Sequence, residues 1–499
     1  MGLFRKKIPV IPFHGDLKTP LLLLGGRDQF LLDDAARGVL VLGGTGSGKT
    51  SGSGCALATA YLKAGMGGLV LCAKPDEAAN WRAYAKAAGR EQDIIEINEI
   101  AERRFNFLDY ALATIAKDGF EGNLLAVIDT ITEAATASSG DGDGDNRFFR
   151  DNAREMVSHV LPLLIAVYGR LTIKDIVAFI DSAATTRDEL ESEDWQKSSY
   201  AARTLAAASL LMDDDPDLEV HGEYWLTRFV DWSDKTRSSV VSTFTSTVYP
   251  FLTGKLRDLF CSETNMVPEL THNGAILIVN LPIKTFGQMG EVAQKIIKYL
   301  WQISVESRTA EGKKSMRPVF MFADECQFFV TSYDAEFFST ARSARACGVY
   351  LTQDLPSFYS RLAGKGSEHD ADALIGKFQT RIFHSNVDKT TNLAAAEMIG
   401  KITKQQASRQ QNVSRNRGEG GAYQPHDVAQ SDNSGLGRSS SETLSTYQDY
   451  AVPPEYFTDQ LRNGTKANRF KVDGIVVTGG KTWKHSRSNF IKAEFDQRK

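Results

Sequence analysis

The 499-residue sequence contains little cysteine and no long apolar stretch. Its five cysteines are scattered, mostly in apolar runs, and no C-x-x-C pair or histidine spacing suits a zinc site, which predicts buried thiols in a reducing cytoplasm. No run of about 18 apolar residues predicts a transmembrane helix, and the basic start Met1–Lys7 lacks a signal-peptide core. We therefore expect a soluble, cytoplasmic protein.

A strong net charge is also absent. The chain has 58 Lys and Arg against 62 Asp and Glu, a formal net charge of -4. This balance excludes the global basic footprint of a simple nucleic-acid binder, so any contact with a polyanion must be local. With 42% hydrophobic residues, the chain is long enough for two or three domains and a large core.

A glycine-rich segment directly after the apolar run Gly38–Leu42 matches a phosphate-binding loop, and a predicted helix, Ser51 to Leu62, follows it. Backbone N–H groups of such a loop surround phosphates, Lys49 reaches the β- and γ-phosphates, and Thr50 binds Mg²⁺. The flanking strand and helix disfavour a glycine-rich surface turn, so the sequence predicts a nucleoside triphosphate site. Its predicted binding residues are Gly43, Gly44, Thr45, Gly46, Ser47, Gly48, Lys49, Thr50 and Ser51.

Two further apolar strands end in polar residues that suit hydrolysis. Val319–Ala323 leads into Asp324 and Glu325, and we expect Asp324 to hold Mg²⁺ through water while Glu325 polarises the attacking water. The alternative is a buried strand that ends in acids at the start of a helix. A later strand, Gly348–Thr352, ends at Gln353, where RecA-like motors place a residue that senses the γ-phosphate.

The order of strand and helix patterns predicts an α/β fold with a mainly parallel central sheet. Residues 1–110 and 256–499 alternate strands with helices, and we interpret them as two parts of one nucleotide-binding domain. Long helical patterns fill residues 111–255 and predict an inserted all-α domain. Further strands are expected at Gly68–Cys72, Gly274–Pro282, Arg381–Phe383 and Gly474–Val477.

One segment, residues 403–446, is rich in polar residues and cannot support a core, which predicts a flexible loop or a hairpin. The stretch at its beginning, Lys401 to Gly418, is basic and free of acids. Two interpretations remain open here: a contact with the backbone of a DNA strand, or a solvated linker. The basic residues are Lys401, Lys404, Arg409, Arg415 and Arg417.

Several short motifs together resemble one protein family, the conjugative coupling proteins of type IV secretion (TraD/TraG type), which are RecA-like motors related to FtsK and HerA. Order and spacing along about residues 20 to 495 carry the resemblance more than any single motif. The motifs are the phosphate loop, Phe105–Asp109, Asn273–Leu277, Phe322–Glu325, Ala344–Gly348 before Gln353, and Ile399-Gly400.

The resemblance implies a RecA-like P-loop ATPase domain with an all-α domain, assembled as a hexameric ring that uses ATP and Mg²⁺. Such a ring delivers DNA, or a relaxase with DNA attached, to subunits of a secretion channel. By position, Lys49, Glu325 and Gln353 would take the catalytic roles given above. Arg345 is the best candidate for an arginine finger that acts across a subunit boundary, and Arg342 is the next.

The chain departs from the family in two respects. Phe107 stands where the family often has proline after the asparagine, a change expected to affect only a turn, and most members begin with transmembrane helices, whereas this sequence predicts none. A separate membrane partner, a motor for mobilisation that stays in the cytoplasm, and recruitment to a different pathway are the alternatives. Two other functions stay open: a nucleotide-dependent adaptor that recruits a secretion substrate and hydrolyses little ATP, and a DNA-pumping motor of the FtsK/HerA branch outside conjugation. Single- and double-stranded DNA are equally compatible with the sequence.

Overall fold

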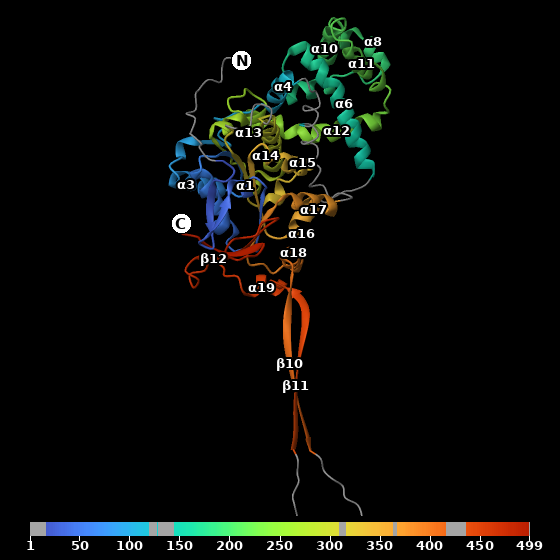
Figure 1. Ribbon diagram of the computed structural model, residues 1–499. Coiled ribbons are helices and arrows are strands. Elements are labelled where there is room, and N and C mark those ends of the chain that lie inside the picture. Colours follow the sequence, from blue (N-terminus) through green and yellow to red (C-terminus); the bar gives the residue numbers. More distant parts are fainter. Residues whose placement is uncertain are drawn as a thin grey trace, which may run out of the picture.

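The computed structural model describes residues 16–118, 127, 144–308, 316–362, 367–415 and 436–498. A nine-stranded sheet lies at its centre, in the order β13-β12-β9-β3-β8-β7-β4-β6-β5 (Figure 1). The seven strands from β9 to β5 are parallel, and β12 and β13 add an antiparallel edge. This confirms the predicted α/β class. The strands are β3 (Val39–Leu42), β4 (Gly67–Leu71), β5 (Ile94–Ile97), β6 (Ile276–Val279), β7 (Val319–Ala323), β8 (Ala346–Thr352), β9 (Thr380–Phe383), β12 (Lys471–Thr478) and β13 (Phe490–Asp496).

The central strands are apolar throughout because helices cover both faces of the sheet. In β3, Leu40 and Leu42 belong to one buried cluster, while Val39 and Val41 belong to a second cluster on the other face. The period of two residues in a strand divides the side chains in this way. The second cluster includes α2 (Cys55–Lys63) and α3 (Glu77–Ala87), and the first includes α14 (Ile283–Ser307), α15 (Tyr333–Thr340), α16 (Leu355–Leu362) and α17 (Ser367–Lys377).

Between β5 and β6 the regular secondary structure of the described residues is helical, and these helices lie toward one end of the molecule (Figure 1). Several of its helices begin at a Ser or Thr whose side chain accepts a hydrogen bond from the first turn, as at Thr172 and Ser233. Among the described residues, no helix combines the length and apolar character needed to cross a membrane. The helices are α4 (Phe107–Asp118), α6 (Gly144–Tyr168), α7 (Ile173–Asp181), α8 (Arg187–Glu191), α9 (Glu193–Ser198), α10 (Tyr200–Ser209), α11 (Asp217–Glu223), α12 (Asp234–Val248) and α13 (Gly254–Phe260).

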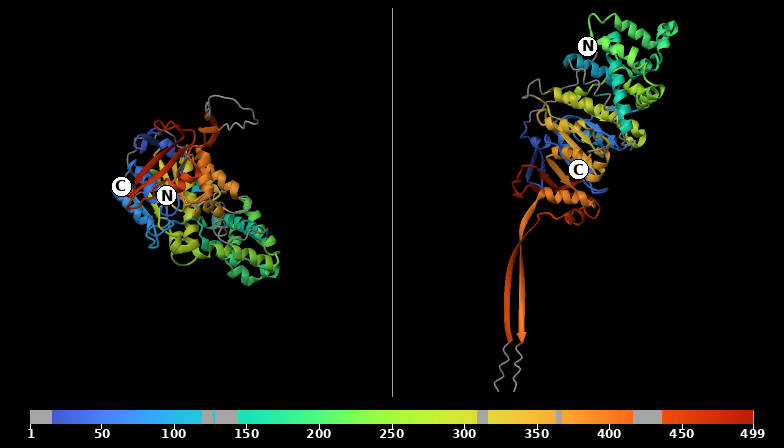
Figure 2. Two further views of the ribbon diagram at one scale, coloured as in Figure 1. Left: turned by 90° about the horizontal axis from the view of Figure 1, so that it is seen from below. Right: turned by 90° about the vertical axis from the view of Figure 1, so that its right-hand side faces the viewer.

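A two-stranded ribbon projects from the opposite end of the molecule (Figures 1 and 2). It consists of β10 (Lys401–Arg415) and β11 (Leu436–Tyr450), which pair antiparallel along their whole length between α18 (Lys389–Ile399) and α19 (Pro454–Asp459). The expectation of a flexible loop over 403–446 is therefore wrong for its described parts, and the hairpin alternative is right. Main-chain hydrogen bonds pair the two strands, and this pairing does not depend on apolar side chains.

A smaller hairpin precedes the phosphate loop. It is formed by β1 (Pro20–Leu24) and β2 (Asp28–Leu31) and is followed by the short helix α1 (Leu32–Ala35). Its buried residues Leu24 and Phe30 extend the apolar cluster that contains α2 and α3.

Candidate nucleotide site

The sheet order brings the predicted motifs together at one edge. Strands β3, β8, β7 and β4 are consecutive neighbours and run in the same direction. Their carboxyl ends therefore meet at the same edge, where ligands bind in open α/β sheets. The phosphate loop follows β3, Gln353 follows β8, Asp324 and Glu325 follow β7, and Lys74 lies shortly after β4.

The loop after β3 has the conformation that its glycines permit. Gly46 and Gly48 have φ values of 75° and 84°, in the left-handed region that favours glycine. The amide of Gly44 donates to the Ser385 carbonyl at 2.9 Å, which ties the loop to the end of β9. The predicted helix then begins as a π-helical turn at Lys49–Gly54 and continues as α2 to Lys63.

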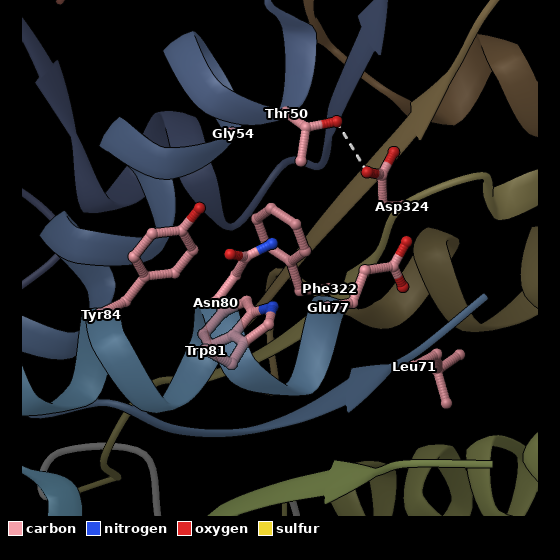
Figure 3. Close-up of a pocket in the computed structure, with 9 residues that line it drawn as sticks. All are labelled: Thr50, Gly54, Leu71, Glu77, Asn80, Trp81, Tyr84, Phe322 and Asp324. Atoms are coloured by element: carbon pink, nitrogen blue, oxygen red, sulfur yellow. Dashed lines mark hydrogen bonds between the residues drawn. The ribbon is translucent and has the colours of Figure 1, made fainter. Parts of the chain in front are cut away.

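Two oxygen groups meet where a divalent cation is expected. The Thr50 hydroxyl donates to Asp324 Oδ2 at 2.7 Å, and Asp324 is 4% exposed (Figure 3). Mg²⁺ prefers such oxygen ligands and keeps several of its waters. Nearby, the buried Ser47 Oγ has no hydrogen-bond partner in the described part of the chain. The residues present therefore fit a Mg²⁺–nucleotide group, which would also supply partners for groups that lack one here.

Glu325 is held by cations in an uncommon backbone conformation, with φ 50°. Its Oε1 lies 2.7 Å from Lys74 Nζ and 3.9 Å from Lys49 Nζ, and its Oε2 accepts from Gln327 at 2.9 Å. Burial opposes ionisation, but the hydrogen bonds from Lys74 and Gln327 and the charge of Lys49 lower the pKa of Glu325 below its usual value. In this arrangement the carboxylate is ionised and engaged.

Gln353 lies between the loop and the acidic pair. Its Oε1 accepts from the Thr45 hydroxyl at 3.3 Å, and its Nε2 is 3.5 Å from Glu325 Oε1. Its backbone carbonyl accepts from Asn386 Nδ2 at 2.8 Å. The residue predicted to sense the γ-phosphate therefore touches both predicted motifs, and a third segment after β9.

A family model described as "Type IV secretory system Conjugative DNA transfer" matches residues 17–421, most of the chain. The chain belongs to this conjugative DNA-transfer family. This confirms the resemblance to coupling proteins. A comparison with curated proteins gave no match.

Solved structures of the coupling protein TrwB share the fold of this family member. An unbound form, TrwBdeltaN70, is 13% identical, with a TM-score of 0.56 over 97% of this chain and 90% of that chain. TrwB in complex with ADP and Mg²⁺ gives 13% identity and a TM-score of 0.57 over the same shares. TrwB with a non-hydrolysable ATP analogue gives 13% and 0.55, over 97% of this chain and 92% of TrwB.

In this family member, the fold brings two further residues to the site, and no motif in the sequence indicated either of them. Lys74 forms the short ion pair with Glu325, and Glu77 at the start of α3 lines a cavity beside Thr50 and Asp324. Burial, and then the charge of Asp324, raise the pKa of Glu77 to about 8. Both follow β4, and only the pairing of β4 with β7 places them here.

His384, at the end of β9, forms a hydrogen bond with the π-helical turn. Its Nδ1 lies 2.8 Å from the Asp473 carbonyl, and its Nε2 lies 2.7 Å from Ser53 Oγ. A carbonyl only accepts, so Nδ1 carries the hydrogen and Nε2 accepts from the serine hydroxyl. Burial lowers the pKa of His384 to about 4, which keeps the ring neutral.

Arg345, the candidate arginine finger, lies at the amino end of β8, whereas Gln353 follows the carboxyl end of that strand. Its φ is 51°, and its guanidinium donates to the Met316 carbonyl at 2.9 Å. Arg342, the second candidate, pairs with Asp33 at 2.8 Å. Neither arginine joins the nucleotide site of its own chain.

The basic residues of the ribbon are distributed over both faces of β10. The backbone register places positions 401, 409 and 415 on one face of β10 and position 404 on the other. Lys404 Nζ lies 2.9 Å from Asp449 Oδ2 across the ribbon, and Lys401 lies over the Tyr450 ring at 5.1 Å. Arg417 lies outside the described residues.

Proposed function

We propose that the chain is an ATP-hydrolysing coupling protein that moves DNA, or a relaxase with DNA attached, to a type IV secretion channel. The observation that carries this proposal is the bond between Thr50 and Asp324 at 2.7 Å, with Lys49 and Glu325 beside it. This is the constellation that phosphoryl transfer needs: a cation for the phosphates, oxygens for Mg²⁺ and a carboxylate for water. Membership of the conjugative DNA-transfer family supports the proposal that the energy of ATP hydrolysis is used to move DNA.

In this proposal ATP and Mg²⁺ are the cofactors, as TrwB complexes with ADP and Mg²⁺ and with an ATP analogue also suggest. The metal, when bound, supplies positive charge to the phosphate oxygens. Lys49 binds the β- and γ-phosphates, and Thr50 and Asp324 hold the metal. The amides from Thr45 to Ser51, apart from that of Ser47, are the proposed phosphate donors, since the amides of Gly43, Gly44 and Ser47 already donate to the carbonyls of Thr352, Ser385 and Gly44.

Glu325 acts on the attacking water only after its carboxylate leaves Lys74. A base whose pKa is lowered by a short ion pair accepts a proton poorly. Gln353, which touches both Thr45 and Glu325, is placed to link arrival of the γ-phosphate to that release. The active arrangement therefore forms on nucleotide binding.

The ring and its partners belong to the same proposal. Six copies would place Arg345 of one subunit toward the site of its neighbour, which agrees with its distance from the site within one chain. The relaxase, or another secretion substrate, and the channel subunits are the protein partners, and the latter bring the ring to the inner membrane. The ribbon carries the basic positions 401, 409 and 415 along one face and is the proposed DNA contact.

A second function is favoured by the state of Glu325. With both carboxylate oxygens engaged, the chain has the features of a nucleotide-dependent adaptor that recruits a substrate and turns ATP over slowly. DNA separates the two functions, because only the motor should be strongly stimulated by it.

The test is the ATPase rate of the full chain with no DNA, with single-stranded DNA and with double-stranded DNA, measured beside the oligomeric mass. The motor is expected to form a ring of about six copies on DNA and to hydrolyse ATP at least about tenfold faster there. A rate that DNA leaves unchanged, with nucleotide still bound, would establish the adaptor instead.

A further inference from the structure

A small cavity adjoins the Thr50–Asp324 pair, between the π-helical turn Lys49–Gly54, α3, β4 and the end of β7 (Figure 3). Apolar residues form much of its wall, and the rings of Trp81 and Phe322 pack edge to face at 5.0 Å. Its volume of about 20 Å³ is room for roughly one water molecule. The lining residues are Thr50, Gly54, Leu71, Glu77, Asn80, Trp81, Tyr84, Phe322 and Asp324.

Glu77 brings an unused carboxylate oxygen to this cavity. The residue is 5% exposed, and its Oε2 accepts from the Ala73 amide at 2.7 Å. Its Oε1 is buried and has no hydrogen-bond partner among the residues that the structure describes. A buried polar atom left in this state costs about 1–3 kcal/mol, and more when it is charged. The fold accepts this cost at a point next to the proposed metal ligands.

The surroundings of Glu77 favour a positive charge there. Figure 3 shows its carboxyl group on the same side of the cavity as that of Asp324. The nearest lysine of the segment, Lys74, gives its short ion pair to Glu325. Two carboxyl groups thus share one small space, and a cation bound between Thr50 and Asp324 would relieve their repulsion.

We propose that Glu77 is a positioning residue for the hydrated divalent cation, and that its Oε1 accepts a hydrogen bond from a water of Mg²⁺ held by Thr50 and Asp324. This inference rests on the proposed Mg²⁺–nucleotide site. Partners outside the direct ligands orient bound water and raise metal affinity. Mg²⁺ keeps several waters, and the cavity offers space for about one of them beside an oxygen that lacks a partner.

The competing explanation is that Glu77 only stabilises the start of α3. An acid in the first turn interacts favourably with the helix dipole, and the Ala73 bond fits that role. This explanation covers Oε2 and leaves Oε1 without a purpose. It also predicts effects on folding alone, which allows the two to be separated.

The experiment measures binding of fluorescently labelled ADP to the full chain, first in EDTA and then across a titration with Mg²⁺. Glu77→Gln should leave ADP affinity in EDTA unchanged and raise the Mg²⁺ concentration for half-maximal effect by about 10- to 100-fold. Asp76→Asn is the matched control, because it makes the same change from carboxyl to amide one residue earlier at an exposed position and should change neither quantity. An unchanged Mg²⁺ dependence in Glu77→Gln would overturn the inference.

The outcomes distinguish this inference from the proposed function. If the unaltered chain binds no ADP with or without Mg²⁺, the nucleotide site itself is wrong. If Glu77→Gln fails to fold, a crystal structure of the unaltered chain with ADP and Mg²⁺ decides: a metal-bound water about 3 Å from Glu77 Oε1 supports the inference. An Oε1 without such a water overturns it.

Discussion

The two ends of the parallel strands use buried charges in opposite ways. At the amino ends, arginines donate to main-chain carbonyls of the loops that lead into the sheet. Arg90 binds the carbonyls of Leu62, Met66 and Gly274 and also pairs with Asp93 at 2.8 Å. Three further bonds repeat the pattern: Arg308 to the Arg317 carbonyl, Arg317 to that of Gly65, and Arg345 to that of Met316.

At the carboxyl ends the charged groups face one another and are partly without partners. Lys49 stands 3.9 Å from Glu325, Glu77 keeps a bare oxygen beside Asp324, and the hydroxyl of Ser47 is unbonded among the described residues. Charges bonded to the chain's own carbonyls stabilise its loops. Buried polar atoms that lack a partner in the described part of the chain can take one from a ligand. The partner of a buried charge, more than its residue type, therefore indicates its role.

The largest expected effect concerns Arg345, and a catalytic role for this arginine would contradict the comparison between the two ends of the strands. Arg345 lies among the structural arginines, yet the family resemblance gives it a role in a neighbouring subunit's site. As a finger in trans, Arg345→Ala should lower the maximal ATPase rate by about 10³-fold and leave ATP binding nearly intact. As a loop stabiliser, the same change should cost only about 1 kcal/mol of unfolding free energy, measured by denaturant titration, with the rate unchanged.

Mixing subunits provides the control for Arg345. Arg345→Ala chains combined with Lys49→Ala chains should recover part of the activity, because some interfaces then pair an intact loop with an intact arginine. The rate should also rise more than linearly with protein concentration. A fully active monomer, or no recovery on mixing, contradicts a finger in trans.

The next largest effect tests the charged residues at the carboxyl ends of the strands. Glu325→Gln should bind ATP and lose about 10²- to 10³-fold in turnover, since the proton acceptor is lost while Asp324 still serves the metal. Lys49→Ala should instead weaken triphosphate binding itself. Equilibrium binding and single-turnover rates separate the two variants, and wild-type turnover in Glu325→Gln would sink the assignment.

The amino-end side is tested by Arg90→Ala. Removing this buried guanidinium takes a donor from three carbonyls and breaks the ion pair with Asp93, and should cost about 3 kcal/mol of unfolding free energy. The control is Arg82→Ala, whose partly exposed pair with Glu96 should cost less than about 1 kcal/mol. Both variants should bind ATP normally while folded. A stable Arg90→Ala chain with weak ATP binding would reverse the comparison.

His384 predicts a dependence of stability on acid. Its pKa in the fold, about 4, is below its usual value, so the unfolded chain takes up the proton first. The unfolding free energy should therefore fall by about 2–3 kcal/mol as pH drops from about 6.5 to about 4. His384→Gln should flatten this slope by that amount. His159 and His272, whose pKa values are also lowered, contribute to the slope that remains, together with carboxyl groups whose pKa values are shifted in the fold, such as Glu77 and Glu325.

The smallest expected effect concerns the ribbon, outside both ends of the sheet. Neutralising Arg409, Arg415 and Arg417 together should weaken DNA binding for all sequences and reduce its salt slope by about two to three. Lys404→Gln is the control, since Asp449 already pairs with Lys404, and should change the slope by less than about one. Basal ATPase should survive in all variants. An unchanged slope in the triple variant returns the segment to a solvated linker.

Local patterns predicted the parts of the site that lie on consecutive residues. The glycine loop, the acidic end of β7 and Gln353 each follow an apolar strand, so their place at one edge followed from a parallel sheet. Lys74 and Glu77 could not be found this way, because only the neighbourhood of β4 and β7 gives them partners. The sequence did not predict the ribbon with certainty, because amino-acid composition shows that apolar residues are few but carries no information about main-chain pairing.

The ribbon also has a mechanical consequence. Its strands leave the body only through Gly400 and Ala451, which are joined by a main-chain bond, and 15 residues at about 3.3 Å each make it about 50 Å long. The side-chain amide of Asn386 donates to the Gln353 carbonyl, and its main-chain N–H donates to the carbonyl of Phe457 in α19, at the base of the ribbon. A rotation of about 10° there would swing the far end through about 9 Å, roughly the rise of three residues in a strand. The two hydrogen bonds of Asn386 thus connect the base of the ribbon to Gln353, the residue predicted to sense the γ-phosphate.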